Sequence, residues 1–293
     1  MKNLNTDNNN SAVLYIVGTP IGNLQDMTFR AVSVLKNCDL ILAEDTRHSI
    51  HLLQNFSIST QLRSYHQHNE QERTAEILSL LEQNKKIALI TDAGMPMISD
   101  PGYVLVKAAL EHNYKITVVP GPTALTSAIS ISGIDCTQFC FAGFLSSKQA
   151  SRLKNLTELY TQIEQQRAVI LYEAPHRVLK CLEDIQTVFG SEHRISVIKE
   201  ITKSYEAVYF GTIETVLDKL TKLDAIKGEY VIIISGNSEL KEPESELEQR
   251  INSAVQLFYS ENINTKTTVK IVSELFKVKK NYVYNLAIKS IIN

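Results

Sequence analysis

The sequence predicts two α/β domains followed by a small helical unit. Short apolar runs alternate with helical patterns over most of the 293 residues, glycine- and proline-rich turns follow several of these runs, and residues 241–293 carry only helical patterns. Alternating strands and helices are typical of a mostly parallel sheet covered by helices. We expect a polar, disordered tail at 1–10, α/β domains at 11–120 and 121–238, and a helical, helix-turn-helix-like unit at 239–293.

The composition is typical of a soluble globular protein, with 44% apolar and 21% charged residues. The tail, MKNLNTDNNN, precedes an apolar run of about six residues, which is too short for a signal peptide or a membrane span. We therefore expect a cytoplasmic protein that has no membrane partner. The four cysteines lack the spacing of a zinc site or of a disulfide framework. A net charge of −2 argues against a protein that coats nucleic acid indiscriminately.

In the first domain, β-rich apolar runs predict strands at 12–17, 40–43, 87–90 and 116–119. The helices between them are expected to begin behind a cap at Asp26, at Asn69, and at Asp100 with Pro101 in the first turn. Residues 91–99 are then a loop at the carboxyl end of a strand. In open α/β sheets, ligands bind at that edge.

The second domain is expected to begin near the rigid hinge at 120–122. Its strands are predicted at 139–144, 169–172, 195–198, 207–210 and 230–234, and several follow one another without a helix, which indicates a more antiparallel sheet. The last residues predict a helix, a tight turn at about 277–279, and another helix. This end is basic, because Glu274 alone opposes six lysines, namely Lys266, Lys270, Lys277, Lys279, Lys280 and Lys289.

Three strand-to-helix turns, at 18–23, 92–96 and 120–124, combine glycine with proline. Glycine lets a ligand approach the backbone, and proline fixes the loop in advance, so together they predict a cleft lined by main chain. Neither G-x-G-x-x-G nor G-x-x-x-x-G-K-[ST] occurs in the chain, so a nucleoside without phosphates fits better than a nucleotide. Asp92 could bind ribose hydroxyls or balance a positive charge. Each turn taken alone could also be an ordinary tight connection.

Two further stretches have alternative interpretations. His66 and His68 lie on one side of an extended segment, as in some metal sites, but no second ligand cluster is evident and a polar loop beside the cleft is favoured. Glu173 could complement a helix dipole, whereas His176 and Arg177 in the first helical turn could bind a phosphate. We therefore predict no metal site.

Eight motifs occur in the order expected for the tetrapyrrole-methylase superfamily. They are GTPIGNLQDMTFRA, AEDTR, YHQHNE, TDAGMPMISDPG, PGPTA, FAGF, YEAPHR and KEITK, and the match spans about residues 13–235. The chain most specifically resembles the ribosomal RNA small subunit methyltransferase I branch. This resemblance implies two α/β domains with S-adenosylmethionine in the cleft between them, usually in a homodimer. It also implies 2′-O-methylation of a cytidine in the decoding region of small-subunit rRNA, either in free rRNA or in the 30S subunit.

The resemblance also implies roles for particular residues. Those expected to contact the cofactor are Pro20, Gly22, Asp92, Ala93, Gly94, Met95, Pro96, Ser99, Gly121, Pro122, Thr123 and Ala124. Those expected to border the substrate are Glu44, Asp45, Arg47, Glu173, His176, Arg177, Lys199 and Lys203. Lys199 stands where the family commonly has Arg, which would remove bidentate phosphate binding at that position.

The chemistry requires a ribose hydroxyl to attack the sulfonium methyl group in line, and a base to accept the hydroxyl proton. Glu173, Glu200 or Lys203 could be that base, and the sequence does not choose among them. The basic terminal helices could dock RNA through phosphates, or could pack on the body or on a dimer partner. Two other functions stay open, namely methylation of a tetrapyrrole precursor and a non-catalytic RNA-binding assembly factor.

Overall fold

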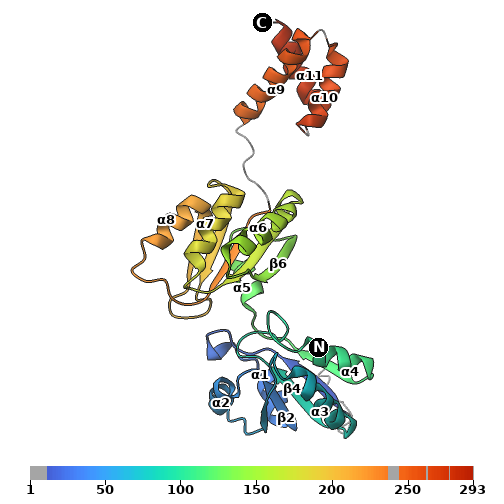
Figure 1. Ribbon diagram of the computed structural model, residues 1–293, viewed down its shortest axis with the longest axis vertical. Coiled ribbons are helices and arrows are strands. Elements are labelled where there is room, and N and C mark those ends of the chain that lie inside the picture. Colours follow the sequence, from blue (N-terminus) through green and yellow to red (C-terminus); the bar gives the residue numbers. More distant parts are fainter. Residues whose placement is uncertain (1–11, 237–243, 262, 277, 293) are drawn as a thin grey trace. The chain divides into compact units, whose positions relative to one another are not determined.

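A computed structural model describes residues 12–236, 244–261, 263–276 and 278–292 (Figure 1). The chain divides into two compact units, Met1–Asn237 and Ser238–Asn293. The tail predicted at 1–10 and residue Lys277 of the predicted turn lie outside the described residues.

The first sheet of the larger unit is wholly parallel, with strand order β3-β2-β4-β1-β5. Its strands are β1 (Val13–Val17), β2 (Leu40–Ala43), β3 (Leu62–Ser64), β4 (Lys86–Ile90) and β5 (Lys115–Val119). The helices are α1 (Phe29–Asn37), α2 (Thr46–Asn55), α3 (Glu70–Glu82) and α4 (Tyr103–Glu111). Successive β4 residues alternate between two cores, since Ala88 packs in the core of α1 and α2, whereas Leu89 packs in that of α3 and α4. Helices therefore cover both faces of this sheet, as predicted.

Three predicted helix starts are wrong by two or three residues. Helix α1 is capped by Thr28, whose Oγ1 accepts from Ala31 N at 3.1 Å, whereas Asp26 ends a short 3-10 turn. Helix α4 begins after Gly102, whose φ of 135° breaks the chain direction behind Asp100 and Pro101. Helix α7 (Val178–Phe189) begins after the turn that holds His176 and Arg177.

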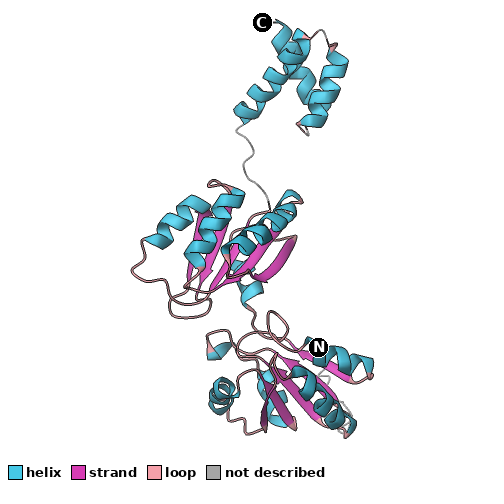
Figure 2. Cartoon of the chain, viewed as in Figure 1, coloured by secondary structure: helices cyan, strands magenta, loops and turns pink. Residues whose placement is uncertain are grey.

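The second sheet has the order β6-β7-β10-β8-β9, and only the β6–β7 pair is parallel. The predicted antiparallel character is confirmed. Its strands are β6 (Phe139–Phe144), β7 (Ala168–Glu173), β8 (Arg194–Lys199), β9 (Ala207–Thr212) and β10 (Tyr230–Ile234). Helices α6 (Gln149–Glu164), α7 and α8 (Ile213–Thr221) pack on one face, and α5 (Ala124–Ile131) packs on the other (Figure 2).

The smaller unit contains α9 (Glu244–Ser260), α10 (Thr265–Leu275) and α11 (Lys280–Ile292). Its core is contributed by all three helices and consists of Ile251, Val255, Val269, Val272, Val283, Leu286 and Ala287. The predicted order of helix, turn and helix is confirmed for α10 and α11. Within the described residues, no helix combines the length and the apolar character needed to cross a membrane.

Candidate active site

A cavity of about 410 Å³ lies where loops of the first sheet meet the carboxyl end of β7. The first sheet contributes Glu44 after β2, and the start of α5 contributes Thr123 and Ala124. The loop after β4 contributes Asp92, Ala93, Gly94, Met95, Ile98, Ser99 and Asp100. The second sheet contributes side chains from β6, β7 and β10. Both sheets are needed to form this site.

Two close backbone contacts join the glycine-rich turns. Thr19 N donates to Gly94 O at 2.9 Å, and Gly94 N donates to Thr19 O at 3.1 Å. A Cβ built on Gly18 would lie 2.7 Å from Gly121 Cα, so neither position has room for a side chain. Gly18 N also donates to Val119 O at 3.1 Å. These contacts bring the turns after β1, β4 and β5 together at one edge of the sheet.

Three carboxylates from the first domain line the cavity, namely Glu44, Asp92 and Asp100. Burial, followed by the charges of Glu44 and Asp92, raises the pKa of Asp100 to about 7. Burial, followed by Asp92, also raises the pKa of Glu44. Asp92 Oδ1 accepts a hydrogen bond from Asp45 N at 3.2 Å, which fixes its orientation. The cluster is short of positive charge, so a cationic ligand would be stabilised there.

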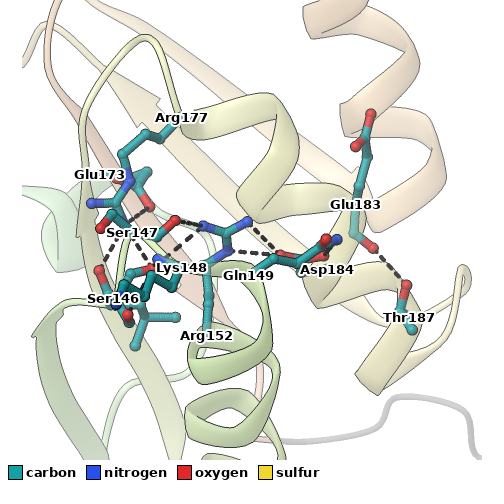
Figure 3. Close-up of polar contacts among 11 residues, drawn as sticks. Ser146, Ser147, Lys148, Gln149, Arg152, Glu173, Arg177, Glu183, Asp184 and Thr187 are labelled. Carbon is teal, nitrogen blue, oxygen red and sulfur yellow. Dashed lines mark hydrogen bonds and ion pairs between the residues drawn. The ribbon is translucent and has the colours of Figure 1, made fainter.

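Glu173 enters the same cavity from the end of β7, and its side chain has no exposed surface. Its Oε1 accepts from Ala174 N at 2.8 Å, and Arg177 Nη2 donates to its Oε2 at 3.2 Å (Figure 3). Arg177 Nη2 also donates to Leu145 O at 2.6 Å. The guanidinium therefore joins the Glu173 carboxylate to the turn after β6, and Arg177 lies before α7 and not in its first turn, where the sequence placed it.

A second cavity, of about 500 Å³, is lined in part by Arg177. Its lining consists of Ser147, Gln149, Arg152, His176, Arg177, Lys180 and Glu183. Arg152 is buried and donates to Asp184 Oδ2 at 2.7 Å and to Ser147 O at 3.2 Å (Figure 3). His176 and Lys180 are exposed, so they supply the accessible cationic groups of this cavity.

The remaining predicted residues divide into two sets. Those that line the first cavity are Glu44, Asp92, Ala93, Gly94, Met95, Ser99, Thr123, Ala124 and Glu173. Those that lie outside its lining are Pro20, Gly22, Asp45, Arg47, Pro96, Gly121, Pro122, His176, Arg177, Lys199, Glu200 and Lys203. Gly22 packs against the Lys203 side chain, and Arg47 pairs with Asp45 in solvent at 2.7 Å.

Lys203 forms a separate charged cluster, in which its Nζ lies 2.8 Å from Glu200 Oε1 and 3.0 Å from Glu229 Oε2. Burial lowers the pKa of Lys203, but the hydrogen bonds that its Nζ donates to Glu200 and Glu229 outweigh burial and raise the pKa. Burial likewise opposes the hydrogen bonds from Lys203 and Glu229 N that lower the pKa of Glu200. Both groups therefore remain charged near neutral pH.

Sequence reasoning did not find several lining residues, namely Ile21, Ile98, Asp100, Phe144, Tyr172, Ala174, Pro175, Ile201, Glu229, Tyr230 and Val231. Asp100 was interpreted only as a helix cap. Glu229 reaches the cavity because β10 inserts between β7 and β8, and a pairing of that kind has no local signal. Among the described residues, no group of three His, Cys, Asp or Glu side chains is arranged for a metal ion.

Solved structures of methyltransferases share this architecture. The crystal structure of uroporphyrin-III-C-methyltransferase from Thermus thermophilus has a TM-score of 0.52 and 19% identity, covering 77% of this chain and 94% of that one. The structure of cobalt precorrin-4 methyltransferase has a TM-score of 0.56 and 18% identity, and the match covers 78% of this chain and 97% of that one. Identities this low show the fold alone. The fold and the cleft together define a two-domain α/β protein of the kind found in methyltransferases.

Sequence comparison gives the family. The family described as Tetrapyrrole (Corrin/Porphyrin) Methylases matches residues 13–217. Relatives called "Ribosomal RNA small subunit methyltransferase I" include one from Synechocystis sp., 41% identical over 94% of this chain and 98% of the relative. Another, from Escherichia coli O157:H7, is 37% identical over 99% of both chains. The chain belongs to the tetrapyrrole methylase family, within the group of these relatives, and it is an S-adenosylmethionine-dependent methyltransferase.

Proposed function

We propose that this methyltransferase acts on small-subunit rRNA and methylates the 2′-hydroxyl of a cytidine in the decoding region. The observation that carries the proposal is the near full-length match to relatives named for small-subunit rRNA, which includes the helical unit beyond the methylase match at 13–217. The eight ordered motifs of the sequence support the same branch of the family.

The first cavity fits the cofactor in size and in charge. S-adenosylmethionine supplies a methyl group activated by a sulfonium cation. The volume of about 410 Å³ lies within the range of about 300–1,000 Å³ that is usual for small-molecule sites. Main chain around Gly94 would approach the nucleoside, and the carboxylates of Asp92 and Asp100 would offset the positive charge. The loops at 92–99 and 121–124 would hold the cofactor, with Pro20 and Gly22 supporting them from the turn after β1.

Glu173, Asp100 and the Glu200–Lys203 pair are the groups to weigh as proton acceptor. Glu173 lines the cavity, but N–H donors already occupy both of its oxygens, which favours a role in orienting the substrate. Glu200 and Lys203 pair with each other outside the lining. Asp100 lines the cavity with a pKa of about 7, which is suited to accepting a proton near neutrality. We therefore add Asp100 to the proposed acceptors.

The groups proposed for the RNA side lie around the second cavity and the charged loops. His176 and Lys180 would contact phosphates at that cavity, and Arg177 would join its lining to Glu173 through a hydrogen bond. Glu44, Asp45 and Arg47 follow β2 and would border the ribose, and Lys199 would contact the RNA as a point charge.

We also propose that the protein acts in the cytoplasm as a homodimer. The proposed domain boundaries are 11–120, 121–238 and 239–293. Support for a dimer comes from the edge strand β9, where Val208 and Phe210 are each 43% exposed. Exposed apolar side chains on an edge strand are common at protein interfaces. Sedimentation of the wild type and of Phe210→Asp measures this directly, and a wild type that sediments as a monomer would contradict the dimer.

Transfer of a tritiated methyl group tests the proposed reaction. The protein and labelled S-adenosylmethionine are incubated in three separate reactions, which contain 30S subunits, free small-subunit rRNA or a porphyrinoid precursor. We expect label in rRNA, at a dinucleotide that resists alkaline hydrolysis because its 2′-oxygen is blocked. Label in the porphyrinoid alone would make the protein a tetrapyrrole enzyme, and cofactor binding without any transfer would support an assembly factor.

A further inference from the structure

The helical unit carries a groove of about 620 Å³ between α10 and α11. Its lining consists of Thr265, Lys266, Val269 and Lys270 from α10, and Lys280, Tyr284 and Ile288 from α11. The residues from α11 are four apart, as are the two lysines of α10, so each helix directs one face at the groove. No residue of this lining belongs to either cavity of the α/β unit.

The groove is cationic. Lys266, Lys270 and Lys280 are exposed, and within the described part of the chain none of their ammonium groups forms an ion pair or a hydrogen bond. Glu274, the acidic residue of α10, is not part of the lining. Within the described residues of the lining, no acidic side chain offsets these three charges. Such an arrangement is stabilised by an anionic ligand.

The floor of the groove indicates which anion fits. Tyr284 is 50% exposed and Ile288 36% exposed, and buried Val269 lies between the lysines of α10. Single-stranded or looped RNA has the complementary pattern, because its phosphates lie beside unstacked bases that pack on aromatic rings. A free phosphate would leave the tyrosine and isoleucine without a partner.

We propose that this groove binds a single-stranded or looped segment of RNA, with Lys266, Lys270 and Lys280 on phosphates and Tyr284 stacked on a base. The choice of RNA rests on the function proposed above. The groove would then hold the substrate RNA at a point other than the methylated ribose. The net charge of −2 makes the groove a local feature and not part of a general cationic surface.

Fluorescence anisotropy of the full-length protein with a decoding-region rRNA fragment tests the groove. The variant Lys266→Ala/Lys270→Ala/Lys280→Ala is compared with Lys36→Ala/Lys154→Ala/Lys219→Ala, which removes the same charge from exposed positions of the α/β unit. Because each lost contact with a single strand reduces the salt slope by about 0.7, we expect the groove variant to have a slope shallower by about 2. We also expect a loss of affinity of about tenfold or more, with the control unchanged.

Tyr284 gives a second, charge-neutral measurement. Tyr284→Phe keeps the ring and should retain affinity, whereas Tyr284→Ala should lose at least about fivefold because stacking is removed. Equal RNA binding by the groove variant and its control would overturn the proposal. Competition by poly-glutamate as effective as that by RNA would also overturn it, because the groove would then be a surface for acidic protein.

The proposed reaction and the groove can fail separately. Calorimetry with S-adenosylmethionine should give the same affinity for the wild type and the groove variant, which also shows that the variant is folded. If the wild type binds rRNA through the groove but transfers no label to the rRNA, the proposed function is wrong, whereas the proposal that the groove binds RNA is supported. If the groove variant and the wild type label rRNA equally well at limiting RNA, the proposal that the groove binds RNA is wrong, whereas the proposed function is supported.

Discussion

Asp100 is the residue of the candidate site whose ionisation is most affected by its surroundings. Its pKa of about 7 in the folded protein lies above the usual aspartate value of about 3.9, so the native state binds more protons than the unfolded state between these pH values. The free energy of unfolding therefore falls as the pH rises from about 4 to 7. Above pH 7, where Asp100 is ionised in the folded protein, the whole of this loss of stability is present.

We predict that Asp100→Asn raises the free energy of unfolding more at pH 8 than at pH 5. Discounted for the partial exposure of the side chain, the gain at pH 8 should be about 1–2 kcal/mol. Urea denaturation at the two pH values measures it. A gain that is independent of pH would show that Asp100 titrates normally in the folded protein.

Gly18 shows how little space the cleft leaves for side chains. A Cβ on Gly18 would lie 2.6 Å from Met95 Sδ and 2.7 Å from Gly121 Cα, and the second contact is with backbone. We predict that Gly18→Ala forces the turns apart, costs about 1–3 kcal/mol of stability and weakens S-adenosylmethionine binding by about tenfold, measured by calorimetry.

Gly190→Ala is the matched control, because a Cβ there meets nothing within 4 Å although φ is +87°. It should cost about 1–2 kcal/mol through backbone strain and leave cofactor affinity unchanged. Equal cofactor affinities for the two variants would show that the contact between Gly18 and Gly121 does not shape the site.

At the level of residues, the sequence predicted that glycine-containing turns follow β1, β4 and β5 at one edge of the sheet, but it missed Asp100. Glycine and proline favour tight turns through their own backbone preferences, so these turns can be predicted from the local sequence alone. Asp100 faces the cavity because Met97 and Ser99 both adopt φ of 70° and Gly102 adopts 135°. Met and Ser rarely take left-handed conformations, so the path of this loop could not be read from its residues.

Helices α6 and α7 are linked by a buried ion pair. Arg152 and Asp184 are each 4% exposed at the side chain, with Nη2 2.6 Å from Oδ2, and Arg152 also holds the turn after β6. We predict that Arg152→Met costs about 3–5 kcal/mol, because Asp184 remains buried without its charge partner. Chemical denaturation measures the loss.

The double variant Arg152→Met/Asp184→Leu provides the control for this pair. Since two apolar side chains replace both charges, it should recover most of the stability lost by Arg152→Met. A double variant as unstable as the single one would indicate that the hydrogen bonds of Arg152 to the turn, and not the ion pair, provide the stability.

Element prediction succeeded where a continuous apolar run marked the strand, including β6, which is only partly buried. Strands β2 and β10 are buried at every residue and were predicted with their observed bounds. Strand β3 was missed because its three residues, Leu-Arg-Ser, are half-buried and have no apolar pattern. The start of α3 behind Asn69 was predicted correctly, although Asn69 Oδ1 accepts from His66 N instead of capping the helix.

For the molecule as a whole, the separate core of the helical unit predicts that its stability is independent of the cleft. Leu286 is 3% exposed in that core. We predict that Leu286→Ala destabilises the smaller unit by about 2–5 kcal/mol and shifts only its own calorimetric transition. The affinity for S-adenosylmethionine should be unchanged. A single merged transition that moves as one would show that the two units unfold together.

The position of β10 has a consequence for how the protein is made. The first sheet is complete once β5 ends at Val119, so it can form while later residues are still being translated. In the second sheet, β10 lies between β7 and β8, yet it is the last strand to be synthesised. Until Ile234 leaves the ribosome, the β6–β7 and β8–β9 pairs have no strand to join them, so a nascent chain arrested before Tyr230 should expose two open strand edges to chaperones and proteases.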